Sequence, residues 1–235
     1  MRLRVDHETR YTYDAPVSYG LQQVRMRPKD SRGQKVLDWT ITVEGGATEL
    51  CYDDHNGNRV DLIGIEPGRT ETSIRCVGLV ENTEGDGVLG KHQGFLPLWH
   101  FKRSSPLTQA GEGVRKLGAG LGDCDIAQVS TGHALSAAIL DTVGYEGGNT
   151  HSGTTAEEAI TGGTGVCQDH AHIFCSAARL MGLPARYVSG YLMMNDRVEQ
   201  DASHAWAEAF FEGLGWVGFD ISNGYSPDER YIRVA

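Results

Sequence analysis

The stretch TGGTGVCQDHAHIFCSAARLMG, residues 161–182, decides the fold of this chain. After its first cysteine, apolar residues recur at the spacing of one helix face, at Ile173, Ala177, Leu180 and Met181. Gly182 follows the last turn and Pro184 comes two residues later, as is typical of a helix end. We therefore expect a buried helix with Cys167 at or within its first turn.

Cys167 has the sequence context of a nucleophile. The unpaired N–H groups and the positive dipole end of a helix N-terminus favour thiolate, which is the nucleophilic form. Gly162, Gly163 and Gly165 precede it and allow both a sharp turn and the close approach of a substrate. A free cysteine is also one of the most buried residue types and commonly acts as a small apolar side chain. This stretch alone leaves both interpretations open.

A second stretch, DASHAWAEAFFEGLGWVGFD at residues 201–220, contains candidate partners for this cysteine. It places His204 and Asp220 on two strand-like runs that are joined by a short turn. A nucleophile, then a base, then a carboxylate that orients the base is the chain order of a Cys-His-Asp triad. The alternatives are a surface histidine and an aspartate that forms a turn with Asn223 and Gly224. The order of the residues favours the triad.

Four separated motifs resemble the core of the bacterial transglutaminase-like proteins, which are relatives of papain-type cysteine enzymes: GVCQDHAH, GLPARYVSGY, SHAWAE and GWVGFD. The close resemblance covers about residues 154–223. A weaker one links the amino-terminal half to the β-rich domain that precedes the core in many of these proteins. The resemblance implies that Cys167 is the nucleophile, His204 the base and Asp220 the acid that orients the base.

The chain departs from the family pattern in two places. Many relatives have Asp-Pro-Thr after the last apolar strand, whereas this chain has Asp220-Ile221-Ser222-Asn223, which keeps the acid and changes its turn. Relatives also commonly continue for some tens of residues beyond the position of Ala235. This second difference leaves open whether a carboxy-terminal segment is missing and needed for activity.

Composition is typical of a soluble globular protein with one large domain or two small ones. A net charge of −10 at pH 7, with no Lys/Arg cluster longer than a pair, argues against nucleic-acid binding. Five cysteines, an odd number, do not predict a disulfide framework. The sequence has no signal-peptide pattern and no apolar run long enough to span a bilayer. We therefore expect a cytoplasmic protein that acts on a peptide or protein substrate, with no nucleic-acid or membrane partner and an undetermined oligomeric state.

Alternation and turn residues predict three segments. Residues 1–83 contain many short strands, with an Asn56-Gly57 hairpin signal, and predict an antiparallel β-sandwich-like domain. Residues 84–103 begin with a Gly-rich stretch and predict a linker and interdomain segment. Residues 104–235 predict helices followed by an antiparallel sheet, which is the α+β order of a papain/transglutaminase-like catalytic core. The expected fold class is therefore α+β.

Three further helices are expected before Cys167. Residues 104–106, Ser-Ser-Pro, predict a helix start with a hydroxyl cap and Pro at the first position, and this helix fades near residues 118–122. A second helix is predicted over residues 127–143. Thr154 and Thr155, each followed three residues later by a glutamate, predict a short capped helix that ends near Gly162.

Metal binding requires separate consideration because His170 and His172 flank Ala171, with Asp169 beside them. Two histidines two positions apart on a helix point to different faces, so they do not easily share one ion. Zinc motifs on helices use other spacings, such as i and i+4. The simpler role for His172 is structural. We predict no metal site and no cofactor.

The residues predict acyl transfer from an amide through an acyl-enzyme, in which Cys167 attacks and His204 protonates the leaving amine. The backbone N–H of Cys167 is the expected oxyanion donor, and Trp99, Tyr145 and Gln168 are candidates for a second donor. Resolution by water would make the protein a peptidase or amidase, which we favour because the chain has no calcium-type acidic loop. Resolution by an amine would make it a protein-glutamine transglutaminase. The remaining alternative is a non-catalytic module that binds a peptide or partner, which the presence of all three triad candidates disfavours.

Overall fold

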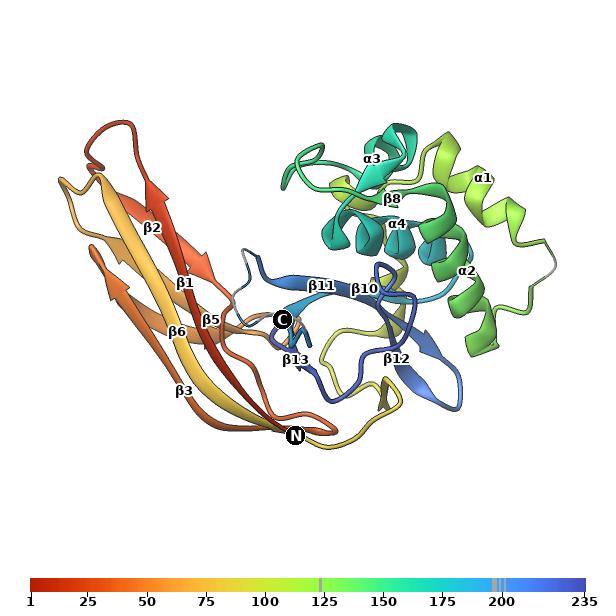
Figure 1. Cartoon of the computed structure of the whole chain (residues 1–235), viewed down its shortest axis with the longest axis horizontal. Helices are drawn as coiled ribbons and strands as arrows, with labels where there is room; N and C mark the ends of the chain where they lie inside the picture. Colours follow the sequence, from red (N-terminus) through yellow and green to blue (C-terminus); the bar gives the residue numbers. More distant parts are fainter. Residues whose placement is uncertain (123, 196–197, 199, 201) are drawn as a thin grey trace. The chain divides into compact units, whose positions relative to one another are not determined.

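The computed structural model describes every residue except 123, 196–197, 199 and 201 (Figure 1). The chain forms two compact units, Met1–Glu84 with Ile232–Ala235, and Gly85–Tyr231. The first unit contains strands, and the second contains helices and a sheet, so the predicted α+β class is confirmed. Among the described residues, no helix is both long and apolar enough to cross a membrane.

The first unit consists of two three-stranded antiparallel sheets. One has the order β1-β6-β3, with strands Arg2–Thr12, Glu71–Asn82 and Gln34–Glu44. The other has the order β2-β5-β4, with strands Gly20–Val24, Arg59–Ile65 and Gly46–Asp53. Val24, Ile63 and Ile74 come from strands of both sheets and form one buried cluster, so the apolar faces of the sheets pack on each other as in a sandwich.

Two local features complete this unit. The predicted Asn56-Gly57 turn joins β4 to β5, and Gly57 takes a left-handed φ of +73° that a residue with a side chain adopts only with strain. The end of the chain is held by Gln34, whose side-chain amide donates to the carbonyl of Arg233 at 2.9 Å and accepts from its N–H at 2.7 Å. These bonds explain why the last residues belong to the first unit.

The sheet of the second unit carries the strands that the sequence predicts after Pro184. Its order is β10-β11-β12-β7, with strands Ala185–Leu192, His204–Phe211, Gly215–Phe219 and Val88–Gly90. Tyr231, the first residue of β13 (Tyr231–Arg233), lies at the β10 edge. Because β7 pairs with β12, part of the segment 84–103 belongs to this unit.

Four helices cover one face of this sheet (Figure 1). They are α1 (Glu112–Gly120), α2 (Val129–Thr142), α3 (Ala156–Gly162) and α4 (Cys167–Leu180). The other three pack around α4, which lies against β10 and β11 and is buried at every residue from Asp169 to Ala178. Phe174 of α4 stacks on Phe219 of β12, with ring centroids 5.0 Å apart. The short elements of the unit are η1 (Leu98–Lys102), η2 (Pro106–Thr108), β8 (Gly144–Tyr145) and β9 (Thr164–Gly165).

The first helix of this unit begins later than the sequence predicts. The Ser-Ser-Pro stretch at residues 104–106 opens only the 3₁₀ turn η2, and α1 starts at Glu112. The backbone N–H of Ser105 donates to the Thr108 hydroxyl at 3.0 Å, which closes the turn after a single round. The Ser-Ser-Pro stretch therefore begins the turn η2, which does not continue into α1.

The start of α1 is set by Glu157, a residue of α3. Its carboxylate accepts hydrogen bonds from the backbone N–H groups of Gly111, Gly113 and Val114, at 3.1, 2.7 and 3.2 Å. Burial raises the pKa of this carboxyl, but the three backbone donors outweigh burial and hold the pKa below its ordinary value. Thr155 caps α3 itself, by accepting from the backbone N–H of Glu158.

Candidate active site

Cys167 is the first residue of α4, as the sequence predicts, and Val166 is the N-cap residue. The carboxylate of Asp169 accepts the N–H of Val166 at 2.8 Å and the hydroxyl of Thr150 at 2.7 Å. This cap satisfies the N–H of Val166, while the N–H groups of Cys167 and Gln168 have no acceptor within the helix. The thiol therefore lies beside unpaired donors at the positive end of a helix.

Two of the glycines before Cys167 have identifiable structural roles. Gly163 ends α3 with a left-handed φ of +71°. A Cβ added at Gly165 would lie 2.8 Å from the Cβ of Asp169, so a side chain there would displace the carboxylate that caps α4. These glycines thus fix where α4 begins and where its cysteine lies.

His204 and Asp220 come together because β11 begins at His204 and the antiparallel strand β12 ends one residue before Asp220. His204 Nε2 lies 2.6 Å from Asp220 Oδ2, and the Asp220 side chain is 0% exposed. The carboxylate holds the Nε2–H, which leaves Nδ1 available to Cys167, whose side chain is close enough to help raise the pKa of His204. The structure therefore brings all three candidate triad residues together within the second unit.

Asp220 accepts two further side-chain hydrogen bonds that the sequence does not reveal. Tyr231 Oη donates to Asp220 Oδ2 at 2.6 Å, and Asn223 Nδ2 donates to the same oxygen at 2.7 Å. The backbone N–H of Asn223 also donates to Oδ1 at 3.2 Å. Asp220 thus forms the turn with Asn223 and also bonds His204, so the two roles that the sequence presents as alternatives coexist. Asn223 lies in the turn that departs from the Asp-Pro-Thr pattern.

Burial and hydrogen bonding act in opposite directions on this histidine and this aspartate. Burial lowers the pKa of His204, but the hydrogen bonds and charges of Asp220 and Cys167 outweigh it and raise the pKa to about 9. Burial raises the pKa of Asp220, but the bonds from His204, Tyr231 and Asn223 hold it below its ordinary value. The arrangement favours an imidazolium beside the Asp220 carboxylate at neutral pH.

The two other histidines of α4 have separate surroundings. His170 is 0% exposed; its Nε2 lies 2.9 Å from the Val143 carbonyl and its Nδ1 lies 2.9 Å from the Ser222 hydroxyl. His172 packs beside Tyr187, with ring centroids 5.1 Å apart. Within the described part of the chain, no group of three or more His, Cys, Asp or Glu side chains lies close enough to hold a metal ion.

The candidate oxyanion donors differ in their relation to Cys167. Burial, followed by the charge of Cys167, raises the pKa of the Tyr145 phenol, which indicates that the phenol lies near the sulfur. Gln168 follows Cys167 directly on α4. Trp99 is 61% exposed on η1. Of the three, Tyr145 is therefore the residue whose electrostatic environment includes Cys167.

All five cysteines are free, and only one combines access with a histidine partner. Cys76 and Cys175 are buried, and burial raises their pKa values to about 12 and about 11. Cys51 and Cys124 are exposed. The thiol of Cys51 donates to the carboxylate of Asp61, and this bond raises the pKa of the thiol. Cys167 is half-buried and interacts electrostatically with His204. It is therefore distinguished from the other four by its environment.

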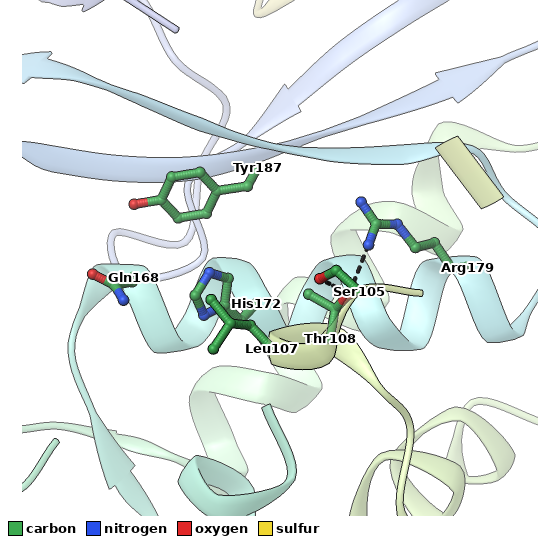
Figure 2. Close-up of a pocket in the computed structure, with 7 residues that line it drawn as sticks. All are labelled: Ser105, Leu107, Thr108, Gln168, His172, Arg179 and Tyr187. Carbon is green, nitrogen blue, oxygen red and sulfur yellow. Dashed lines mark hydrogen bonds between the residues drawn. The ribbon is translucent and has the colours of Figure 1, made fainter. Parts of the chain in front are cut away.

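A pocket of about 360 Å³ runs along α4 within the second unit (Figure 2). Figure 2 shows Gln168, His172 and Arg179 following one another along the helix, with Tyr187 of β10 across from the first two. Residues of η2 complete its wall. Because Gln168 is the neighbour of Cys167, one end of the pocket lies beside the candidate nucleophile.

Comparisons with known proteins agree with this fold. Residues 123–221 match the family model of the transglutaminase-like superfamily, and residues 3–81 match that of the bacterial transglutaminase-like N-terminal region. An uncharacterized protein of Mycobacterium leprae is 25% identical, with 99% of this chain and 87% of the relative covered. One of Mycobacterium tuberculosis H37Rv is 28% identical, with 99% and 82% covered. A crystal structure described as "a Putative Cysteine Protease from Cytophaga hutchinsonii" aligns with 100% of this chain and 81% of its own at a TM-score of 0.79 and 21% identity, which shows a shared fold.

Proposed function

Because this chain belongs to the bacterial transglutaminase-like proteins, having both their N-terminal region and their core, we propose that it is a cysteine hydrolase that cleaves amide bonds of peptides. One observation carries the proposal. His204 Nε2 lies 2.6 Å from Asp220, and Cys167, at the start of α4, is close enough to His204 to help raise its pKa. This is the arrangement that a thiolate–imidazolium nucleophile requires.

In the first half of the reaction, the Cys167 thiolate attacks the carbonyl carbon of the amide and forms a carbon–sulfur bond. The negative charge moves to the carbonyl oxygen, where the backbone N–H of Cys167 and the Tyr145 hydroxyl are the proposed donors. The tetrahedral intermediate then collapses and the carbon–nitrogen bond breaks. His204 gives its proton to the leaving nitrogen, so a neutral amine departs and a thioester to Cys167 remains.

In the second half, the now neutral His204 accepts a proton from water as the water oxygen attacks the thioester. Collapse of this intermediate breaks the carbon–sulfur bond, releases the carboxylic acid and restores the thiolate–imidazolium pair. Asp220 keeps the imidazole oriented throughout and stabilises its charged form. The carboxylate is itself held by Tyr231 and Asn223.

Transamidation differs from hydrolysis only in the second half, where an amine replaces water. Both outcomes use the same acyl-enzyme, and the acceptor is decided by water access and the shape of the site. We place hydrolysis first and protein-glutamine transglutaminase activity second. A module that binds peptides without catalysis is the third possibility, and it requires no acyl-enzyme.

Intact-mass spectrometry of the full chain with a library of peptide amides tests the proposal. We expect a covalent acyl adduct on Cys167 and a free-acid product, both absent in Cys167→Ala and retained in Cys124→Ala, the variant of an exposed cysteine. The reaction is repeated with an added primary amine. A product carrying the amine would establish the transglutaminase alternative, whereas peptide binding without adduct or product would establish the binding module.

A further inference from the structure

The pocket along α4 carries polar side chains for which the proposed reaction has no use. Gln168, His172 and Arg179 are four and seven residues apart, which places them on one face of the helix. Figure 2 shows the three side chains in a row along the pocket. Helix α4 is buried from Asp169 to Ala178, and a polar face inside such a helix needs hydrogen-bonding partners.

His172 lacks these partners. Its side chain lines the pocket and the residue is 7% exposed, yet its Nδ1 has no hydrogen-bond partner among the described residues. Burial lowers the pKa of its imidazole, so the ring is neutral and offers one donor and one acceptor nitrogen. Buried polar atoms are rarely left unbonded, so the Nδ1 of this pocket-lining histidine indicates a ligand with polar groups.

Arg179 lies at the far end of the pocket with unused donors. Its guanidinium donates from Nε to the carbonyls of Phe101 and Ala185, from Nη1 to the Thr108 hydroxyl at 2.7 Å, and from Nη2 to Ala185 at 2.9 Å. These bonds occupy at most three of its five N–H groups, and every acceptor is neutral. No carboxylate of the described residues pairs with it. A half-buried, unpaired guanidinium with two free donors is suited to a carboxylate.

The opposite end of the pocket adjoins the candidate nucleophile. Burial, followed by the charge of Cys167, raises the pKa of the Tyr187 phenol, so this pocket residue lies near the sulfur. Gln168 and Arg179 are separated by about 16 Å of helix at a rise of 1.5 Å per residue. An extended peptide covers this distance in about five residues, or about four when the arginine side chain leans toward the helix N-terminus.

We propose that this pocket binds an extended peptide next to the scissile amide and selects peptides with a carboxylate about four residues from the reacting carbonyl. Arg179 binds the carboxylate, whether it is a C-terminus or an acidic side chain. His172 and Tyr187 bond the polar groups of the peptide between this anchor and Cys167. The assignment as a substrate subsite rests on the proposed function, whereas the binding of acidic peptides does not.

Calorimetry on the full chain carrying Cys167→Ala, which cannot turn over, tests the binding. The probes are acetylated alanine peptides of two to six residues, each as the C-terminal carboxylate and as the carboxamide. We expect the carboxylate to bind at least about tenfold tighter, most strongly near four residues, because its bond to Arg179 is charge-assisted. Arg179→Gln removes this preference. Arg115→Gln, which removes the same charge from an exposed position on α1, retains it.

Equal binding of the two forms, absence of binding, or a preference that survives Arg179→Gln would overturn the proposal. Because Arg179 also bonds two carbonyls, Arg179→Gln is checked by circular dichroism, and Arg179→Lys, which keeps the charge, is measured beside it. A second readout needs no arginine variant: the carboxylate peptide should shift the ring ¹⁵N resonances of His172 and leave those of His170 unchanged. If the peptides bind as expected but no acyl adduct forms on Cys167, the proposed function fails and the acidic-peptide site remains.

Discussion

Two buried carboxylates of the same sheet have cationic partners, with different consequences. Glu208 and Asp220 have side chains that are 0% exposed, and each lies 2.6 Å from its partner, Arg186 and His204 respectively. The Arg186 guanidinium lies 4.0 Å over the ring of Trp216 and keeps its charge at every physiological pH. His204 can gain or lose a proton, and its second nitrogen is available to Cys167.

A buried ion pair does not by itself indicate a catalytic site. The Arg186 pair contributes to the fold, because the guanidinium compensates the buried charge of Glu208. The His204 pair contributes to the proposed chemistry, because the proton it holds can be passed to a substrate. Substitutions at the two pairs should therefore have different effects on activity and on stability.

Replacing His204 by glutamine should abolish most of the activity without unfolding the chain. Glutamine can still donate to Asp220 but cannot exchange a proton, so we expect kcat/KM to fall by about 10⁴-fold. Steady-state kinetics on a substrate from the peptide-amide screen measures the fall. A loss smaller than about tenfold would mean that His204 acts no differently from Arg186.

Replacing Arg186 by glutamine should lower the stability of the fold and leave the activity nearly unchanged. Glu208 would keep its buried charge and lose the guanidinium that lies 2.6 Å from it, so we expect the free energy of unfolding to fall by about 3 kcal/mol. Urea denaturation measures this loss, with Arg115→Gln as an exposed control that should change it by less than about 0.5 kcal/mol. The kcat/KM of the folded fraction should stay within about threefold of wild type. A large drop in kcat/KM at unchanged stability would show that the Arg186 pair belongs to the active site.

The pH dependence of stability should also distinguish the pairs. The pKa of His204 is about 9 in the folded chain and has an ordinary value of 6.5, so the folded state holds a proton that the unfolded state has lost between these values. The stabilisation is therefore fully present below pH 6.5 and is lost as the pH rises through about 9, a decrease of up to about 3 kcal/mol. Urea denaturation across this range should show the decrease in wild type and not in His204→Gln. An equal decrease in both would assign it to other groups.

Removing the Tyr231 hydroxyl should produce the smallest effect. Tyr231→Phe deletes one of the three side-chain donors on Asp220 Oδ2, so the pKa of this carboxyl should rise while His204 and Asn223 still hold it. We expect the acid limb of the kcat/KM profile to move to higher pH and the free energy of unfolding to fall by about 1 kcal/mol. An unchanged acid limb would show that Tyr231 only packs against the site.

The parts of the site that depend on local sequence could be predicted. Periodicity and end signals placed Cys167 in the first turn of a buried helix, because helix faces and caps are encoded within a few residues. The pairing of His204 with Asp220 followed from two antiparallel strands joined by a short turn. The assignment of chemical roles to these residues came from the family resemblance and stays a proposal.

The parts that depend on distant residues could not be predicted. Glu157, a residue of α3, sets the start of α1. The prediction that α1 begins at the Ser-Ser-Pro stretch is therefore wrong, because no local signal reveals this distant cap. Tyr231 reaches Asp220 across a loop, and no spacing rule connects them. The spacing of Gln168, His172 and Arg179 was visible in the sequence, but only the structure places a pocket beside it.

Iodoacetamide alkylation tests whether Cys167 and His204 form a thiolate–imidazolium pair. The alkylation rate of each cysteine is measured against pH for wild type and His204→Ala. Cys124 is the internal reference, because it is exposed and has no histidine partner among the described residues. We expect Cys167 to react fastest, to remain reactive below the pH at which a free thiol of pKa about 8.5 loses its thiolate, and to slow by about tenfold or more without His204. A Cys167 that reacts no faster than Cys124, or equally fast in His204→Ala, would contradict the thiolate–imidazolium pair.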